Sequence, residues 1–478
     1  MTRDRGVEII QKTEDERRPL RILQVNTLHG RGGAAEIAWN LHRAYRNRGV
    51  DSWMAVKRLE VTEPSVMPIP NDRRGRFPTR LLRRWDRFAG REDSRFAGTW
   101  RLLDLPPEPP DLVHCHNMHG GYFDLRALPW LSRQVPVILT LHDAWLLSGH
   151  CAHSFDCRRW ETGCGACPDL TIYPALHRDG TAANWRRKRA IFRRSRLWVS
   201  SPARWLLDRA ERSILLPAIA DARVIPNGVD LSVFGPANRR KARRALDLPA
   251  DSRVLLFVSD GIRRSIWRDW ESLRAAAASV ANRLKGARPL LLGLGEEGPT
   301  EHLDSIDIRY VGYQEDPVIV AKYFQAADVY VHPARTDTFP TSVLQALACG
   351  TPVIATEVGG IPEQVRPLVR QAATGSPQSG ATGGATGILV PPGDSAALAD
   401  ALECVLADED LRAELGANAA NDARRRFGLD RQVDEMIDWY REILGRGRPT
   451  DLTPATVDAE RAPLDTHDRT TTESALAH

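Results

Sequence analysis

Short apolar runs alternate with helix-like stretches along most of this 478-residue chain. The runs are continuously apolar, which is typical of strands buried on both faces of a parallel sheet. Helix-like stretches such as Glu36–Arg48 and Ser342–Cys349 separate most of them. Strand–helix alternation builds helix-covered parallel sheets, and here it occurs twice. We therefore expect an α/β protein with two doubly wound domains.

The two sets of expected strands divide near residue 205. In the first half we expect strands at 21–27, 52–57, 111–116, 137–143 and 197–201. In the second half we expect them at 223–227, 253–259, 289–293, 308–312, 328–333, 352–356 and 387–391. We assign residues 1–205 to an N-terminal domain and 206–430 to a C-terminal one. The Gly/Ser-rich stretch 371–387 predicts a flexible loop, and the aperiodic tail 445–478 predicts disorder.

Composition restricts the class of protein. A net charge of +5 is too small to predict nucleic-acid binding. Seven cysteines are too few for a disulfide-stabilised secreted domain. No apolar run approaches the roughly 18 residues of a membrane span, and the charged stretch Met1–Leu20 lacks the apolar core of a signal peptide. We expect a large cytoplasmic protein, and most such proteins are enzymes.

Polar residues gather where the strands of the first half end. Gly32 and Gly33 open the first helix, where backbone N–H groups favour an anion. His116 and Asn117 follow the third strand, and His142-Asp143 ends the fourth. Ligands bind at the carboxyl ends of parallel strands, so we expect a binding site there. The alternatives are a tight turn without a ligand and ordinary structural histidines.

The second half places an acid and an amide around one predicted helix. Asp337 precedes a helix that starts near Thr341, and Gln345 lies about one turn into it. A carboxylate and an amide suit sugar hydroxyls, although a loop acid and a solvated glutamine would look the same. The stretch 259–268 offers Arg263 or Arg264 with Arg268 for phosphate oxygens, which guanidinium groups bind bidentately.

Four cysteines cluster after the fourth strand. Cys151, Cys157, Cys164 and Cys167 stand within seventeen residues, beside His150 and His153. In a cytosolic chain this clustering favours a structural zinc ion. The spacing is not that of a standard zinc finger, so unliganded thiols and disulfides are the alternatives.

Two stretches of the first half are rich in arginine. Residues 73–101 hold ten Arg against three acids, with Trp and Leu at intervals, and 185–196 adds seven basic residues. Such segments suit an anionic membrane surface, and solvated arginine-rich helices are the alternative.

The chain resembles retaining glycosyltransferase family 4, which has the GT-B fold. The resemblance covers Arg21 to about Leu444. It rests on the Gly32-Gly33 loop, TLHD at 140–143, IPNGVD at 225–230, ADVYVHPA at 327–334, DTFPTSVLQALACGTPVIA at 337–355, VGGIPEQV at 358–365 and GILVPPGD at 387–394.

This resemblance implies a nucleotide-sugar donor bound mainly by the C-terminal domain, an acceptor bound by the N-terminal domain, and no catalytic metal. It implies that the helix at 431–444 crosses back to the N-terminal domain. His142 and Asp337 would be the catalytic residues. The residues that would bind the donor are Gly32, Gly33, Arg263, Arg268, Gly295, Phe339, Pro340, Thr341 and Gln345. Those that would face the acceptor are His116, Asn117 and Asp143.

Two positions depart from the family. The family has two glutamates separated by seven intervening residues, one on the donor sugar and one on the nucleotide ribose. Asp337 and Gln345 stand there. A branch of the family has an Asp-x-x-Pro form at the first position. Gln345 keeps an acceptor but no charge, so we expect Gln345→Glu to tighten nucleotide-sugar binding, or at least not to weaken it.

The expected activity is transfer of a sugar from a nucleoside diphosphate to a saccharide hydroxyl, plausibly on a lipid-linked saccharide at the inner face of a membrane. Two alternatives remain open. One is a nucleotide-sugar epimerase on the same fold. The other is a non-catalytic, saccharide-binding relative of the transferases.

Overall fold

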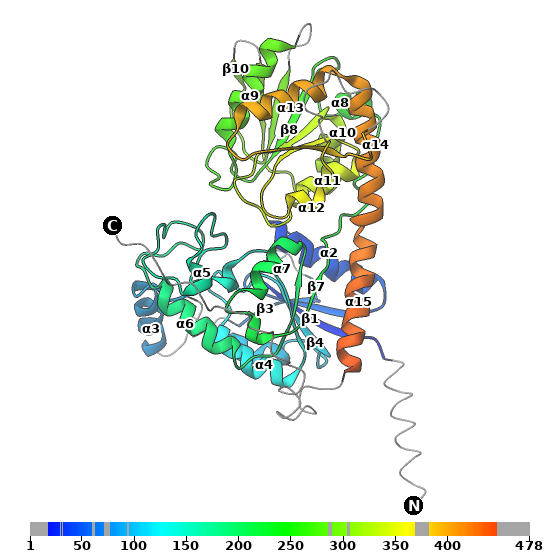
Figure 1. Ribbon diagram of the computed structural model, residues 1–478. Helices are drawn as coiled ribbons and strands as arrows, with labels where there is room; N and C mark the ends of the chain where they lie inside the picture. The colour runs from blue at the N-terminus through cyan, green and yellow to red at the C-terminus, as the bar shows by residue number, and fades with distance from the viewer. Residues whose placement is uncertain are drawn as a thin grey trace, which may run out of the picture.

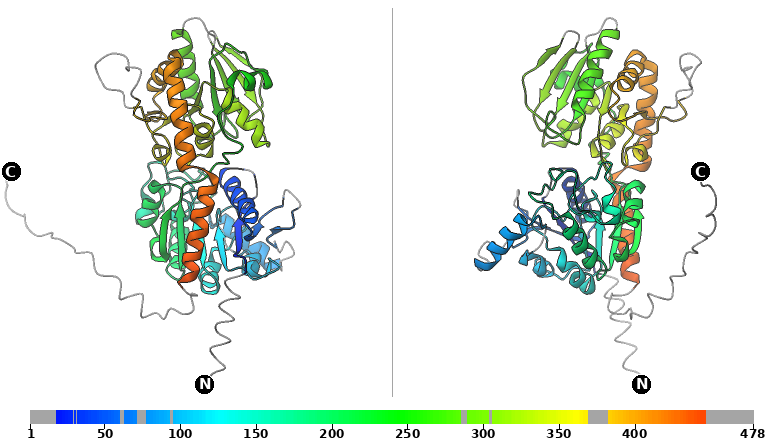
Figure 2. Two further views of the ribbon diagram at one scale, coloured as in Figure 1. Left: turned by 90° about the vertical axis from the view of Figure 1, so that its right-hand side faces the viewer. Right: turned by 60° about the vertical axis from the view of Figure 1, so that its left-hand side comes forward.

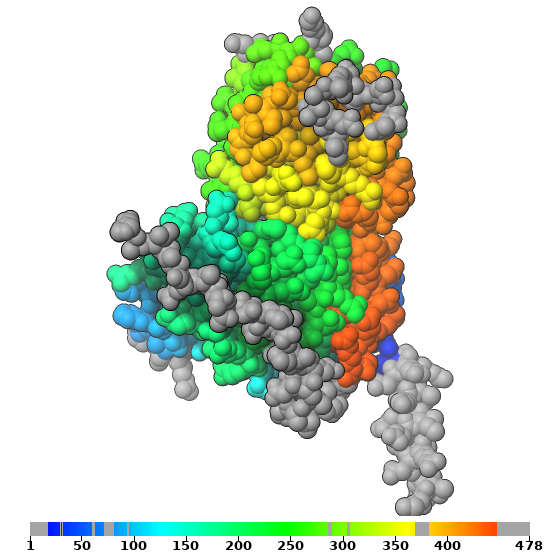
Figure 3. All heavy atoms as spheres, viewed as in Figure 1, coloured from blue at the N-terminus to red at the C-terminus, as the bar shows by residue number. Residues whose placement is uncertain are grey.

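The computed structural model describes residues 18–28, 30, 32–59, 63–70, 77–92, 95–284, 289–303, 306–368 and 382–446. Two α/β units are stacked one above the other, and helices of the C-terminal end run along one side of both (Figure 1, Figure 3). The loop expected at 371–387 and the tail at 445–478 lie mostly outside the described residues.

The first unit is built on a parallel sheet of seven strands in the order β3-β2-β1-β4-β5-β6-β7. The strands are β1 Arg21–Asn26, β2 Asp51–Val56, β3 Val66–Pro68, β4 Leu112–Cys115, β5 Val137–Thr140, β6 Leu197–Ser201 and β7 Ile219–Val224. The strand order reverses between β1 and β4. In a doubly wound sheet this switch opens a crevice at the carboxyl ends of the strands.

The second unit repeats the plan, with strand order β10-β11-β9-β8-β12-β13-β14 and a switch between β8 and β12. Its strands are β8 Val254–Val258, β9 Leu290–Leu294, β10 Glu301–Leu303, β11 Ile306–Val311, β12 Val329–His332, β13 Val353–Thr356 and β14 Gly387–Val390. All pairs are parallel except β10 with β11.

Helices cover both faces of each sheet. In the first unit they are α2 Gly33–Asn47, α3 Phe77–Phe88, α4 Leu128–Gln134, α5 Arg159–Thr162, α6 Thr181–Phe192 and α7 Arg204–Glu211, with short 3₁₀ turns at Ala97–Asp104, Leu125–Ala127, Trp145–Leu147 and Leu216–Ala218. The later ones are α8 Arg239–Ala245, α9 Trp270–Arg283, α10 Pro317–Ala326, α11 Thr341–Ala348, α12 Ile361–Gln364, α13 Ser395–Ala407, α14 Glu409–Arg426 and α15 Leu429–Gly445.

The boundary expected at residue 205 is wrong. It falls inside α7, and β7, expected at 223–227 as part of the second half, pairs with β6 in the first sheet. The short connection through α7 returns the chain beside β6, so the first sheet extends to Val224. The sequence also failed to predict β3 and β10. Three residues are too few to show a periodic pattern.

Helix α15 returns to the first unit, as expected, and closes its core. Buried apolar side chains of α15, among them Met436 and Trp439, pack with Leu41 and other residues of α2. The Tyr440 hydroxyl lies 2.7 Å from His114 Nδ1 and 3.1 Å from the Tyr45 hydroxyl. This packing joins α15 to the first unit (Figure 2).

Buried histidines make the stability of this fold sensitive to pH. Burial, reinforced by Arg46, lowers the pKa of His42 to about 3, and burial beside His142 lowers that of His114 to about 3. Between pH 6.5 and 4 the unfolded chain therefore binds protons that the native chain does not.

We expect the free energy of unfolding to fall as the pH is lowered from about 6.5 to 4, by up to about 1.4 kcal/mol per pH unit for each such histidine. Urea unfolding at pH 7, 6 and 5 measures this. A midpoint independent of pH over that range would contradict it. Replacing His42 by asparagine should reduce the slope.

Candidate active site

Loops that follow neighbouring strands of the second sheet meet at one ion pair. The segment after β8 runs beside the segment after β12, where Asp269 N donates to Pro333 O at 2.7 Å and Arg335 N donates to Trp267 O at 2.9 Å. This pairing brings Arg268 Nη2 to 2.7 Å from Asp337 Oδ2. The sequence assigned both residues to one site, and the structure places them in contact.

Asp337 is ionised in this setting. Burial alone would raise its pKa, but the Arg268 guanidinium and His332 hold the pKa well below its usual value. His332 Nε2 lies 3.4 Å from the same carboxylate oxygen. Strand β12 ends at His332, and the sequence analysis did not identify this residue. Its position at the carboxyl end of a central strand could have indicated that it belongs to the site.

The backbone at Gly359 and Gly360 packs closely against the loop that carries Asp337. A side chain at Gly359 would lie 1.8 Å from Asp337 O, and one at Gly360 would lie 2.1 Å from Thr338 O. Only glycine permits this approach, which explains the paired glycines of the VGG motif. After the loop, Phe339 packs edge-on against Phe427, Pro340 O accepts from Gln364, and Thr341 begins α11.

Gln345 contacts the first unit. Its Nε2 donates to Glu36 Oε1 at 3.2 Å, across 309 residues of sequence. Burial raises the pKa of Glu36, and the bond from Gln345 opposes that rise. Glu36 could not be predicted as a site residue, because nothing in a single sequence indicates which residue of one domain faces the other domain. A glutamate at position 345 would face this carboxylate, so the expectation that Gln345→Glu does not weaken binding does not fit this geometry.

The helix that carries Glu36 begins at the predicted glycine loop. Gly32 is the N-cap of α2 and has φ +88°, a conformation that favours glycine. Among the residues that the structure describes, and apart from the immediate chain neighbours, no atom lies within 4 Å of a Cβ built at Gly32 or Gly33. The glycines therefore leave room beside the amino end of α2, where backbone N–H groups favour an anion.

Histidines of the first unit occupy the ends of β4 and β5. His116 Nδ1 lies 2.9 Å from His142 Nε2, and burial lowers the pKa of both rings, that of His142 to about 4. Beside them, His119 Nε2 lies 2.8 Å from Asp143 Oδ2. The backbone of Asn117 bonds to Asn26 and Thr27 at the end of β1. The predicted residues of this edge therefore do lie together.

Arg263 is separate from the ion pair. Its Nη2 lies 2.6 Å from Glu296 Oε1, and its guanidinium lies over the Tyr310 ring at 4.9 Å. Gly295 has φ +124°, and a side chain there would lie 2.2 Å from Ser259 O. The structure thus brings Arg268, and not Arg263, to Asp337.

The cysteine-rich segment of the first unit also reaches the second unit. Phe155 stacks on Trp267 with ring centroids 5.7 Å apart, and His153 packs edge-on against the same ring at 5.5 Å. His153 Nδ1 lies 3.5 Å from Thr336 Oγ1. Because Trp267 precedes Arg268, this segment helps to hold the arginine in place.

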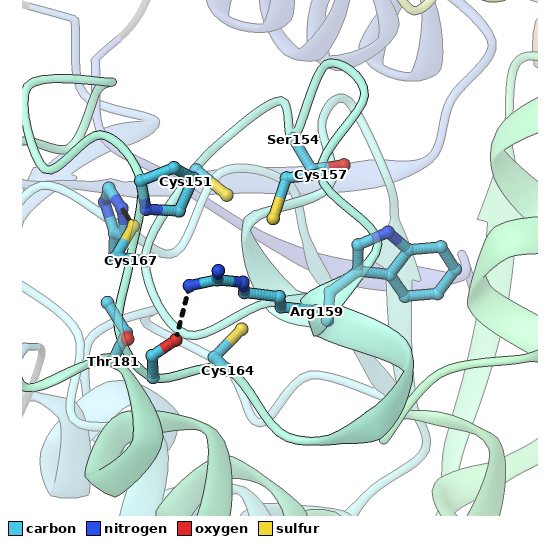
Figure 4. A pocket seen from close by; sticks show the side chains of 11 residues that line it. Cys151, Ser154, Cys157, Arg159, Cys164, Cys167 and Thr181 are labelled. Atoms are coloured by element: carbon cyan, nitrogen blue, oxygen red, sulfur yellow. Dashed lines mark hydrogen bonds between the residues drawn. The ribbon is translucent and has the colours of Figure 1, made fainter.

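The four cysteines line one pocket (Figure 4). His150 Nε2 lies 3.4 Å from Cys167 Sγ, and the Arg159 side chain extends among the thiols to bond Gly165 O. Burial raises the pKa of the Cys151 thiol to about 11. Within the ranges described above, no three Cys, His, Asp or Glu side chains are placed to hold a metal ion. The thiols therefore share a pocket but do not form a ready zinc site.

Two family models match the chain in succession. Residues 31–233 match the model described as Glycosyltransferase Family 4, and residues 252–408 match the one described as Glycosyl transferases group 1. The first covers the glycine loop and the histidine edge, and the second covers Arg268, Asp337 and Gln345.

Curated relatives include the D-inositol 3-phosphate glycosyltransferase of Saccharomonospora viridis, which is 35% identical over 50% of this chain and 55% of its own length. That of Catenulispora acidiphila is 29% identical over 72% of this chain and 75% of its own. The chain spans about half the length of the first two curated relatives it matches.

Solved structures share the fold. Sucrose-phosphate synthase from Thermosynechococcus elongatus superimposes with TM-score 0.60 at 21% identity, covering 90% of this chain and all of that one. WaaG, described as a glycosyltransferase involved in lipopolysaccharide biosynthesis, gives TM-score 0.57 at 15% identity, covering 88% and 99%. Anabaena HepE in complex with UDP gives 0.56 at 16%, covering 88% and 100%. These likenesses confirm the expected GT-B fold.

The contact between Glu36 and Gln345 predicts a charge-sensitive pair. Gln345→Glu places two carboxylates together and removes the donor, so we expect a loss of about 2 kcal/mol in the free energy of unfolding. The exchange Glu36→Gln with Gln345→Glu restores a donor and an acceptor and should recover most of that loss. Urea unfolding of the two single variants and the exchange measures the coupling. Additive losses would contradict it.

The zinc prediction is tested by elemental analysis. Four thiolates that rearrange around zinc should give about one zinc per chain after purification without chelator. Cys157→Ser should then release the metal, whereas Cys349→Ser, at a buried cysteine outside the pocket, should not. Protein free of zinc would favour unliganded thiols.

Proposed function

Because the chain belongs to glycosyltransferase family 4, we propose that it transfers a sugar from a nucleoside-diphosphate donor to a saccharide hydroxyl, with retention of the anomeric configuration. The observation that carries the proposal is the Arg268–Asp337 pair on the second unit, with Gln345 of the same unit bonded across to Glu36 in the first turn of α2. A fixed cation, a fixed carboxylate and a free helix terminus are the groups that a phosphate-linked sugar requires.

The diphosphate is assigned to Arg268 and to the amino end of α2. A guanidinium binds phosphate oxygens bidentately, and the N–H groups after Gly32 and Gly33 add a second set of donors. Both stabilise the charge that develops on the departing diphosphate, and neither has to reorganise in order to do so. Arg263 would join them only by leaving Glu296.

The transferred sugar is assigned to Asp337 and His142, and the ribose to Gln345 with Glu36. Asp337 is held ionised and accepts from sugar hydroxyls. Gln345 donates to Glu36, so its Oε1 is left to accept from a ribose hydroxyl. Position 345 carries no carboxylate in this chain, and Glu36 of the first unit provides a carboxylate beside it.

Little covalent chemistry is required of the chain. In a front-face displacement the acceptor oxygen attacks from the side on which the diphosphate departs. Its proton passes to that leaving group, so the protein mainly positions the reactants. The acceptor is assigned to the edge formed by His116, Asn117 and Asp143. No metal or other cofactor is assigned to catalysis.

Titration calorimetry with UDP-glucose and other nucleotide sugars tests this function against its alternatives. A transferase binds a nucleotide sugar and consumes it only with an acceptor. An epimerase converts it without one. A saccharide-binding protein without activity would bind the acceptor and not the nucleotide sugar.

Asp337→Asn separates sugar positioning from nucleotide binding. We expect its turnover to fall by on the order of 10²-fold, while affinity for free nucleoside diphosphate is unchanged because Arg268 is retained. Arg268→Ala should lower turnover by a similar factor and also weaken the bare nucleotide. Arg283→Ala, at an arginine of α9 that pairs with Asp400 and Glu403, is the control. If Asp337→Asn weakens the bare nucleotide as much as the nucleotide sugar, the assignment is wrong.

We also propose peripheral contact with an anionic membrane through α3, which projects from the side of the first unit (Figure 2). Its outer face exposes Leu81, Trp85 and Phe88, and Trp85 is 61% exposed. Exposed arginines flank them, and Asp86 on the inner face is paired with Arg95. Apolar and cationic groups on one helix suit a lipid interface, where an acceptor on a lipid carrier would be reached. No described helix is long and apolar enough to cross a membrane.

Sedimentation with phosphatidylglycerol vesicles tests the contact. Binding should fall with added salt and should fall several-fold in a Trp85→Ser, Phe88→Ser variant. Ile266→Ser, Val318→Ser removes comparably exposed apolar groups from the other unit and should leave binding unchanged. Equal pelleting of all three proteins would reject α3 as the contact.

A further inference from the structure

The ring of His142 has one nitrogen engaged and one available. Its Nε2 lies 2.9 Å from His116 Nδ1, and its Nδ1 has no hydrogen-bond partner among the residues the structure describes. The two rings stack at 5.2 Å. Both are neutral, because burial holds the pKa of each well below 6.5. In a neutral pair only one ring donates, so the direction of this bond decides which nitrogen of His142 carries a proton.

Gln24 on β1 sets the direction. One end of its amide lies 3.1 Å from His116 Nε2 and 3.2 Å from Ala38 O. A backbone carbonyl only accepts, so this end must be the nitrogen. The other end lies 3.2 Å from His42 N, which only donates, and is therefore the oxygen. Gln24 thus donates to His116 Nε2, which must be unprotonated.

The consequences follow along the chain of bonds. With Nε2 accepting, neutral His116 carries its proton on Nδ1 and donates it to His142 Nε2. His142 then accepts at Nε2 and carries its own proton on Nδ1. We propose that Gln24 and His116 form a positioning relay that fixes His142 in the Nδ1–H tautomer, so that His142 presents a hydrogen-bond donor to the transferred sugar.

This use of the donor rests on the proposed function, whereas the tautomer does not. Asp337 accepts from sugar hydroxyls, and His142 in this tautomer donates to a sugar oxygen, so the two groups are complementary. The relay runs through the parallel pairing of β1 with β4. Gln24 stands directly opposite His114, and His114 precedes His116 by two residues. Gln24 acts on the sugar only through His116 and His142, so it is a positioning residue, and His116, which lies on the edge assigned to the acceptor, positions the ring of His142.

Nitrogen NMR of histidine-labelled full-length protein tests the tautomer directly, since protonated and unprotonated ring nitrogens resonate far apart. The His142 signals are assigned by their loss in His142→Asn. The expected result is a protonated Nδ1 and an unprotonated Nε2 in the wild-type protein without ligand. A protonated Nε2 on His142 would overturn the relay.

Gln24→Met tests the positioning role. It removes the amide donor at similar length, so His116 is free to protonate at Nε2. We expect a mixed His142 tautomer and a fall of about tenfold in kcat, the loss of roughly one hydrogen bond. His116→Asn keeps a donor at the Nδ1 position and should keep the tautomer, whereas His116→Phe should lose it.

Thr140→Val is the matched control. It deletes a buried hydroxyl that bonds the neighbouring His114 and Ser200, so it disturbs the same core without touching the relay. The His142 tautomer should be unchanged in it. If Gln24→Met shifts the tautomer and leaves kcat unchanged, the positioning role is wrong. If the wild-type protein transfers no sugar, the proposed function fails, and the NMR result still decides the relay.

Discussion

Parallel pairing of strands is the constraint on which the rest of this structure depends. It brings the carboxyl ends of the parallel strands of a sheet to the same edge, and reversal of the strand order at β1/β4 and β8/β12 opens that edge between neighbouring helices. Helix α15 follows the second unit in sequence and packs on α2 of the first unit. Side chains far apart in sequence then meet at the contact of Gln345 with Glu36 and at that of Trp267 with Phe155.

The polar groups at these contacts differ in charge between the two units. In the first unit burial keeps the histidines neutral, so their hydrogen bonds have fixed directions and carry no charge. In the second unit Arg268 keeps Asp337 ionised despite its burial. The neutral, directional histidines of the first unit and the charged Arg268–Asp337 pair of the second unit therefore supply two kinds of contact, orientation by hydrogen bonds and stabilisation of charge.

Most of the fold was predictable because its signals are local. Continuous apolar runs located the central strands to within a few residues, and the glycines at positions 32 and 33 marked the start of α2. The three-residue strands β3 and β10 were missed because they are too short to show a pattern. The boundary at 205 failed for a different reason. The sequence of β7 is compatible with a strand of either domain, and only its pairing with β6 assigns it to the first sheet.

The sequence by itself determined the family resemblance and the two doubly wound sheets, and it predicted Asp337, Arg268 and His142 as site residues, because each is carried by a contiguous motif. Only the tertiary structure decided which groups face them. Glu36 opposite Gln345, His332 behind Asp337 and Gln24 behind His116 are separated from their partners by stretches whose lengths carry no information about proximity. The direction of a hydrogen bond is likewise set by every neighbour of a buried amide at once. The tautomer of His142 therefore follows from the packing of β1, α2 and β4, and from no motif in the chain.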